Sequence, residues 1–296
     1  MRIVVTGREG QVARSLVEKG TAAGHEIVVV GRPELDLAGD GDRIVAAIEA
    51  VTPDVIVSAA AYTQVDKAES ERELAFAINE GGARWVARAA HRLGIPLLHL
   101  STDYVFDGSK PSPYVEDDAT GPASVYGASK LAGEEAVRRE HLNSTVLRTA
   151  WVYSPFGANF VRTMLRLAGE RDEVRVVADQ RGNPTSALDI AEGILAVAAN
   201  LLGNPDPRLR GIFHITADGE ASWADFAEAI FGFSAERSGP AAAVRRIGTA
   251  DYPTPASRPA NSRLDSSKLA EAHGVRLPDW RASVKEVVTR LLQRAA

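Results

Sequence analysis

Three residues that can act on a proton lie within one stretch of the sequence: Thr102, Tyr126 and Lys130. Tyr126 and Lys130 are four positions apart in a segment of helical character, so their side chains share one face of the helix. Thr102 follows the apolar run 95–100, which is typical of a buried strand, and therefore lies where that strand leaves the sheet. A neighbouring ammonium favours the phenolate and lowers the pKa of a phenol from its usual value of about 10. The pattern predicts a phenol, an ammonium and a hydroxyl in one small volume, with Tyr126 suited to proton transfer.

A second set of residues is suited to binding a dinucleotide. Residues 2–6 are predicted to form a buried first strand, and Gly7, Gly10 and Ala13 follow immediately before a helical pattern. Small residues at this spacing allow a tight turn and the close approach of a pyrophosphate to the helix N-terminus. Because the spacing lies between a strand and a helix, it indicates a variant of the dinucleotide fingerprint.

The end of the second predicted strand, residues 26–30, bears on the choice of cofactor. An acid that binds the ribose of NAD is expected there, whereas the chain has Gly31 and Arg32. Arg32 is suited to the 2'-phosphate of NADP, so NADPH is the expected cofactor. Glu34 and Asp36 lie close enough to keep NADH as a second option. Asp36 and Leu37 are expected beside the adenine, and small residues after the third strand are expected to admit the ligand: Ala59, Ala60 and Ala61.

The elements that must position these residues alternate between strands and helices up to about residue 150. This alternation predicts an α/β, Rossmann-type doubly wound parallel sheet. Beyond that point strands and helices no longer alternate regularly, which predicts a smaller, discontinuous C-terminal α/β substrate lobe. The expected division assigns 1–150 to the dinucleotide-binding domain, with 174–210 returning to it, and 151–173 and 211–296 to the substrate-binding lobe.

The composition excludes several classes of protein. With 296 residues, 45% of them hydrophobic, the chain can bury a substantial core. The net charge of -5, without blocks of like charge, argues against nucleic-acid and membrane partners. The absence of cysteine excludes disulfides, thiolate metal sites and a cysteine nucleophile. No signal peptide or membrane-spanning run is evident, so a cytoplasmic location is expected.

Several motifs resemble those of the extended short-chain dehydrogenase/reductases, along nearly the full length of the chain. They occupy residues 6–11, 59–69, 101–108, 126–134, 148–153 and 252–265. The tyrosine-lysine motif is specific only to that superfamily, whereas 101–106 and 258–262 are narrower signals. Within the superfamily the chain is most similar to reductases of dTDP-linked 4-keto sugars. The resemblance implies that NAD(P)H reduces carbon 4 of such a sugar.

The resemblance also implies roles for individual residues. Tyr126 protonates the carbonyl oxygen as hydride reaches carbon 4, Lys130 lowers the pKa of Tyr126 and holds the nicotinamide ribose, and Thr102 hydrogen-bonds the reacting oxygen. The expected cofactor contacts are Gly7, Gly10, Gln11, Val12, Arg32, Asp36, Leu37, Ala59, Ala60, Ala61, Tyr126 and Lys130. The expected contacts with the sugar and the nucleotide diphosphate are Asp103, Tyr104, Trp151, Asn159, Phe160, Arg258 and Asn261.

Three positions depart from relatives of that kind. Ala13 replaces a third glycine, which is tolerable because the position needs only a small residue, and Ser58 stands where an asparagine usually precedes the alanines. Some relatives hold a metal between subunits, but Ser15 offers no carboxylate at one such position, so no metal is expected. The expected partner is a small nucleotide-sugar substrate, and the expected assembly is a monomer or a homodimer.

Two other functions remain open. A nucleotide-sugar epimerase or 4,6-dehydratase of the same superfamily would retain its NAD through the cycle. Dehydratases need extra acids beside the threonine, and here Asp103 is followed by Tyr104 instead of a second carboxylate. A non-catalytic regulatory subunit would keep the fold and the nucleotide pocket, as in relatives that bind a methionine adenosyltransferase. The presence of Thr102, Tyr126 and Lys130 argues against this function, and turnover of external NADPH separates all three.

Overall fold

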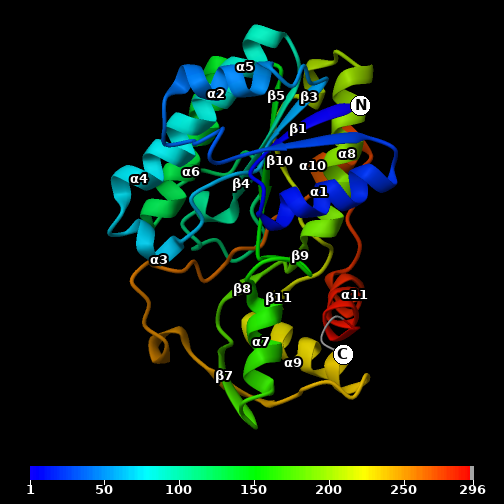
Figure 1. Ribbon diagram of the computed structural model, residues 1–296. Coiled ribbons are helices and arrows are strands. Elements are labelled where there is room, and N and C mark those ends of the chain that lie inside the picture. Colours follow the sequence, from blue (N-terminus) through cyan, green and yellow to red (C-terminus); the bar gives the residue numbers. More distant parts are fainter. Residues whose placement is uncertain (294–296) are drawn as a thin grey trace.

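The computed structural model describes residues 1–293 and consists of a large lobe built on a parallel sheet and a smaller lobe packed at one end of it (Figure 1). The sheet has six strands in the order β10-β5-β4-β3-β1-β2, and every neighbouring pair is parallel. Its strands are β1 (Arg2–Thr6), β2 (Glu26–Val30), β3 (Val55–Ser58), β4 (Leu97–Thr102), β5 (Ser144–Thr149) and β10 (Gly211–His214). The predicted fold class is therefore confirmed.

Helices cover both faces of the sheet, as its largely buried central strands require. One face packs against α1 (Gln11–Ala22), α8 (Ala187–Gly203) and α10 (Ser267–His273). The other face packs against α2 (Gly41–Glu49), α5 (Ala83–Leu93) and α6 (Val125–Glu140), seen on the opposite side of the sheet in Figure 1. Short turns complete this side: α3 (Val65–Ala68), α4 (Arg72–Phe76), the π-helical turn Ala77–Gly82 and the 3-10 turn Asp103–Val105. No helix within residues 1–293 is both long enough and apolar enough to cross a membrane.

The strand order reverses direction at β1. This strand pairs with β2 on one side and with β3 on the other, so the loops after β1 and β3 diverge and leave a crevice between their carboxyl ends. Thr6, the last residue of β1, accepts hydrogen bonds at Oγ1 from the backbone amides of Ala59 and Ala60, both at 3.0 Å. The two loops that border the crevice are therefore tied to each other.

The smaller lobe has its own core, rich in aromatic side chains. Phe226, Trp280 and Tyr153 meet there, between helices and short strand pairs. Its helices are α7 (Phe160–Ala168), α9 (Trp223–Ala235) and α11 (Trp280–Gln293). Its strand pairs are β7 (Glu173–Val177) with β12 (Ala243–Ile247), β8 (Arg181–Gly182) with β11 (Ala221–Ser222), and β6 (Val152–Tyr153) with β9 (Thr185–Ser186).

Two of the expected lobe boundaries differ from the structure. Residues 174–210 were expected to return to the large lobe, but β7 pairs with β12 in the smaller lobe, and only α8 packs beside α1. Residues from 211 onward were expected in the smaller lobe, but β10 is the sixth strand of the main sheet. The physical reason is that each of these strands pairs with a partner far away in the sequence, which alternation along the chain does not reveal.

Helix α6 lies unusually close to its neighbours because two glycines face them. A Cβ at Gly127 would lie 2.2 Å from the carbonyl oxygen of Tyr104, and a Cβ at Gly133 would lie 2.1 Å from that of Asn79. The helix begins with Ser124 as its N-cap, whose hydroxyl accepts the amide of Gly127 at 3.1 Å. These contacts set the helix that carries the tyrosine and lysine directly against the loop that follows β4.

Candidate active site

Tyr126, Lys130 and Thr102 converge where β4 ends beside α6, as the sequence predicts. Thr102 is buried, and its hydroxyl donates to Asp103 Oδ1 at 2.8 Å. Lys130 is 3% exposed and donates from Nζ to the carbonyl oxygen of Leu100 at 2.6 Å. The ring of Tyr126 meets that of Tyr104 edge to face, with centroids 5.5 Å apart. The site therefore places a phenol, a buried ammonium and a hydroxyl around the end of one strand.

The protonation of Tyr126 differs from the expectation that Lys130 lowers its pKa. Burial, followed by the nearby charge of Asp103, raises the pKa of Tyr126 to about 12, and contact with Thr102 only partly opposes this. The ammonium of Lys130 is directed to the Leu100 carbonyl, and burial lowers the pKa of Lys130 to about 8. Tyr126 therefore keeps its proton across the neutral range, as the donor in a reduction requires.

Asp103 is a buried carboxyl group beside these residues. Burial raises the pKa of Asp103 to about 6, although hydrogen bonds involving Ser262 and Thr102 oppose this shift. Its charge also contributes to the raised pKa of Tyr104, for which burial is the larger cause. A carboxyl group in this state accepts the Thr102 hydrogen bond and orients that hydroxyl.

The crevice between β1 and β3 has the features of a pyrophosphate site. Gly7 has a φ of 93°, and a Cβ there would meet the Ala60 side chain at 3.1 Å, so the backbone needs glycine at this point. Gly10 is the N-cap of α1, no side chain caps that helix, and its first turn contains no acidic residue. Uncapped amides at a helix N-terminus bind anions, so the residues present fit the diphosphate of a dinucleotide.

The residues after β2 surround the expected position of the adenosine. Arg8 pairs with Glu34 at 2.7 Å, which engages one of the two acids that kept NADH as an option. Arg32 is exposed and forms no ion pair with any residue in 1–293. Asp36 Oδ1 accepts the amide of Ala38 at 3.1 Å, and Leu37 is buried against Gly82. Among the charged residues here, Arg32 is thus the one available to a 2'-phosphate.

Asn159, expected at the substrate, makes several hydrogen bonds within the protein. It caps α7, with Oδ1 accepting the amide of Arg162 at 3.2 Å. Its Nδ2 donates to Gln11 Oε1 at 3.1 Å and to the carbonyl oxygen of Ser154 at 2.9 Å. Gln11, expected at the cofactor, thereby joins the start of α1 to the smaller lobe. Asn159 does not line the cavity described next.

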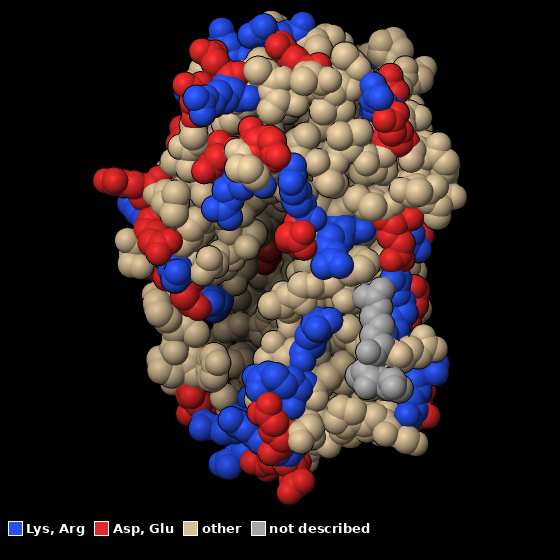
Figure 2. Space-filling view, viewed as in Figure 1, with Lys and Arg blue, Asp and Glu red and all other residues tan. Residues whose placement is uncertain are grey.

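A cavity of about 820 Å³ opens between the lobes, on the face that Figure 2 shows as hollowed. The large lobe contributes Tyr104 and Asp66 to its wall, and the smaller lobe contributes Phe160 and Trp223. Its other lining residues include Arg166, Arg171, Arg175 and Arg258. Tyr126 does not line the cavity, but Tyr104 does, and the Tyr104 ring also contacts the ring of Tyr126. The cavity therefore begins beside Tyr126 and extends away from it. Its size and arginines suit an extended anionic ligand.

Arg258, expected at the nucleotide diphosphate, lines this cavity, and it has a partner that the sequence did not indicate. Its Nη2 lies 2.8 Å from Asp66 Oδ2, and Asp66 Oδ1 accepts the amide of Ala256 at 3.2 Å. Asp66 therefore holds the loop that carries Arg258 against the large lobe.

Trp151 is buried in part and stacks on Trp223, with ring centroids 3.6 Å apart and planes 7° apart. Its φ of 48° is left-handed, and the ring packs closely over Gly182. Trp223, rather than Trp151, lines the cavity. Trp151, expected at the sugar, thus supports the part of the cavity wall that Trp223 forms.

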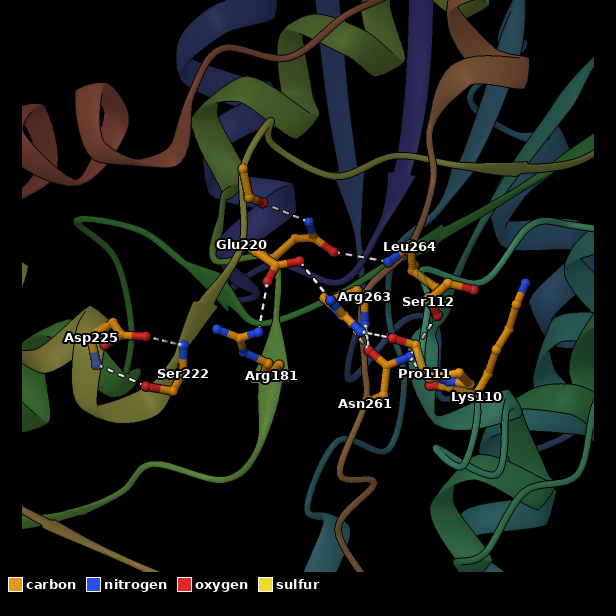
Figure 3. Close-up of polar contacts among 12 residues, drawn as sticks. Lys110, Pro111, Ser112, Arg181, Glu220, Ser222, Asp225, Asn261, Arg263 and Leu264 are labelled. Atoms are coloured by element: carbon orange, nitrogen blue, oxygen red, sulfur yellow. Dashed lines mark hydrogen bonds and ion pairs between the residues drawn. The ribbon is translucent and has the colours of Figure 1, made fainter.

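Asn261 was expected to grip the diphosphate, but its side chain is fully used within the protein. Figure 3 shows it turned toward the 110–112 segment, where Nδ2 donates to the carbonyl oxygens of Lys110 at 2.7 Å and Ser112 at 2.8 Å. Oδ1 accepts from the amide and Nε of Arg263, at 3.1 and 2.7 Å. Arg263 in turn pairs with Glu220 at 2.8 Å. With both donors and both lone pairs engaged, Asn261 fastens this loop to the 110–112 segment and to Arg263.

Sequence reasoning missed several residues that shape the site. Thr6 and Asp66 lay within the motifs 6–11 and 59–69, but the motifs assigned neither residue a partner. Trp223 was placed on a helix of the smaller lobe, and a helical pattern alone does not indicate that it faces Trp151 and the cavity. Within residues 1–293 no group of three or more His, Asp or Glu side chains is arranged to hold a metal ion.

The doubly wound sheet, the glycine turn after β1 and the threonine, tyrosine and lysine at β4 and α6 define the class of extended short-chain dehydrogenase/reductases. Residues 1–293 match the family described as the RmlD substrate binding domain, and the chain belongs to that family. The resemblance inferred from the motifs is therefore confirmed.

Individual relatives agree with this placement. The chain is 52% identical over 292 residues to a dTDP-4-dehydrorhamnose reductase of Sinorhizobium fredii, covering 99% of this chain and 98% of the relative. A crystal structure of a dTDP-4-dehydrorhamnose reductase from Clostridium acetobutylicum superposes with a TM-score of 0.91 at 36% identity, covering 99% and 100% of the two chains. The enzyme of the same name from Bacillus anthracis, crystallised in complex with NADP, has a TM-score of 0.90 at 34% identity and covers 97% and 98%.

Proposed function

We propose that this protein reduces the C4 keto group of dTDP-4-dehydro-β-L-rhamnose to give dTDP-β-L-rhamnose, with NADPH as its cofactor and NADH as a less favoured one. The observation that carries the proposal is the half-buried Tyr126 beside Thr102, whose raised pKa keeps it protonated and which lies next to Tyr104 at the wall of an arginine-lined cavity. The names of the most similar relatives support the same reaction.

The chemistry assigns a distinct task to each residue. The bound NADPH supplies the hydride to carbon 4. Tyr126 donates its phenolic proton to the C4 oxygen, Thr102 holds that oxygen by a hydrogen bond, and Asp103 orients the Thr102 hydroxyl. The buried ammonium of Lys130 stabilises the negative charge left on Tyr126, and it holds the nicotinamide ribose of the bound cofactor.

The cavity accounts for recognition of the nucleotide. Arg258 contacts the diphosphate, while Phe160 and Trp223 provide apolar wall surface beside it. Binding energy from this remote part of the substrate positions carbon 4 against the nicotinamide. In this scheme the large lobe binds the dinucleotide and the smaller lobe completes the substrate site. We also propose that the protein is cytoplasmic and is a monomer or a homodimer.

The assay that tests the proposal supplies the purified protein with the product of the preceding dehydratase and epimerase steps and follows NADPH absorbance. Stoichiometric oxidation of NADPH with formation of dTDP-rhamnose is the expected result. Binding of NADPH without any oxidation would favour the regulatory subunit instead. Turnover of the sugar without consumption of external NADPH would favour an epimerase or dehydratase that retains its NAD.

Arg32→Ala should raise the Michaelis constant for NADPH more than that for NADH. Arg32 is exposed and lies at the end of β2, while the neighbouring acid Glu34 is engaged by Arg8. Loss of a charge-assisted contact with the 2'-phosphate costs about 1.5 to 3 kcal/mol, or roughly one to two decades in Michaelis constant. Steady-state kinetics with both cofactors measures the effect. Equal changes for the two would show that Arg32 does not contact the 2'-phosphate.

A further inference from the structure

A buried acid lies one helical turn beyond Lys130 on the same face of α6. Glu134 is 1% exposed. Its Oε1 accepts from Ser101 Oγ at 2.5 Å and from Arg148 Nε at 2.9 Å, and its Oε2 accepts from Arg148 Nη2 at 2.7 Å. The carboxylate therefore binds β4 through the serine and β5 through the arginine.

The position of Ser101 makes this contact important for the active site. Ser101 stands between Leu100, whose carbonyl accepts the Lys130 ammonium at 2.6 Å, and Thr102, whose hydroxyl belongs to the reacting group of residues. Two side chains of α6, Lys130 and Glu134, thus hold two consecutive residues of β4. The helix cannot shift or rotate against the strand without breaking both contacts.

Stability alone is a weak reason for this arrangement. Burying an ion pair costs desolvation that the attraction often fails to recover, and well-packed apolar residues frequently serve as well. The Arg148 guanidinium is 2% exposed and also lies 5.0 Å from the centre of the Phe106 ring. The pair thus lies in the core one helical turn beyond Lys130, where the charge of Glu134 acts on that lysine.

The charge of Glu134 acts directly on Lys130. Burial lowers the pKa of Lys130 to about 8, and the carboxylate of Glu134 opposes that shift. On β4, Lys130 also faces His99, which burial keeps neutral by lowering its pKa well below the usual value. The charged residues of α4, the π-helical turn and α5 on this side of α6 are exposed: Arg72, Glu73, Glu80, Arg84, Arg88, His91 and Arg92. In α3, Asp66 pairs with Arg258 and Lys67 with Glu71.

We propose that Glu134 is a positioning residue, whose carboxylate joins α6 to β4 and β5 and keeps Lys130 charged and directed at Leu100, beside Thr102 and Tyr126. The role of Lys130 in the reaction rests on the proposed function. The contact itself and its electrostatic effect do not, so they are tested without turnover.

The test measures the free energy of unfolding against pH for matched pairs of proteins that differ by Lys130→Met. Lys130 has a lower pKa in the folded than in the unfolded state, so between these two values the unfolded chain binds more protons and stability rises with pH. In the wild-type pair the contribution of Lys130 should begin to rise near pH 8. In the Glu134→Gln pair the contribution of Lys130 should begin to rise about one pH unit lower, because the carboxylate that raises the pKa of Lys130 is gone.

Glu116→Gln is the matched control, since Glu116 is also buried and accepts the amide of His214 at 2.8 Å. The proteins that carry Glu116→Gln should have a lower free energy of unfolding. The pH at which the contribution of Lys130 begins to rise should stay near 8. If Glu134→Gln fails to fold, Arg148→Gln replaces it, and the uncompensated carboxylate should move the onset to higher pH.

An onset that stays unchanged in the variant at Glu134 or Arg148 would overturn the proposal. If the wild-type protein reduces the nucleotide sugar, the alkaline limb of kcat for Glu134→Gln should shift in the same direction. If the wild-type protein does not reduce the nucleotide sugar, the proposed function fails while the unfolding result stands.

Discussion

Tyr126→Phe should reduce turnover by about a hundredfold or more while leaving the affinity for NADPH nearly unchanged. In the proposed reaction the phenol of Tyr126, whose pKa is raised to about 12, is the proton donor, and phenylalanine has no proton to give. The ring stays in place, so its edge-to-face contact with Tyr104 and the packing of α6 persist. Steady-state NADPH oxidation gives the turnover, and a fluorescence titration of NADPH gives the binding constant.

Tyr104→Phe is the matched control for this variant. Tyr104 lines the substrate cavity and touches the ring of Tyr126, so loss of its hydroxyl should act mainly on the Michaelis constant for the sugar nucleotide. Turnover of Tyr126→Phe at the wild-type rate would rule out Tyr126 as the donor. An equal fall of kcat in both variants would mean that the two hydroxyls share the proton transfer.

Arg258→Ala should lower kcat/KM for the nucleotide sugar by one to two decades without changing NADPH affinity. Loss of one charge-assisted contact with the diphosphate costs about 1.5 to 3 kcal/mol. Arg258 lines the cavity between the lobes, away from the cofactor crevice, so the cofactor should not sense its loss. The measurement compares kcat/KM for the sugar nucleotide with the binding constant of NADPH.

Asp66→Asn separates binding by Arg258 from the support that its ion pair gives to the loop. The pair spans 2.8 Å, and its carboxylate competes with any diphosphate for the guanidinium. If Arg258 contacts the substrate, Asp66→Asn should leave kcat/KM unchanged or raise it. If Arg258 only ties the loop to the large lobe, both variants should lose activity to the same degree.

Much of the large lobe was predictable because its determinants are local. Apolar runs predict the strands and helical periodicity predicts the helices, while Gly7 and Gly10 indicate the turn through short-range conformational requirements. Thr102, Tyr126 and Lys130 could be found together because one strand end and one helical spacing suffice to bring them near each other. The motifs then led to the family, which the full-length match confirms.

Electrostatics at the site was not predictable from the same residues. Spacing places Lys130 near Tyr126, but the direction of its ammonium depends on the Leu100 carbonyl and the pKa values depend on burial. The same limit applies to the two asparagines. Asn159 and Asn261 lie in segments that suggest ligand binding, and only the positions of Gln11, Lys110 and Ser112 reveal that their amides are engaged.

By itself, the sequence determined the class of fold, the glycine turn and the nearness of Thr102 to Tyr126 and Lys130, because these depend on apolar runs, on helical spacing and on where a strand ends. Only the tertiary structure decided that β7 joins β12, that β10 completes the main sheet, that Asp66 holds Arg258, and that Glu134 reaches Ser101 and Arg148. These are contacts between segments far apart in the chain. Their formation depends on how the packed lobes meet, which no local pattern encodes.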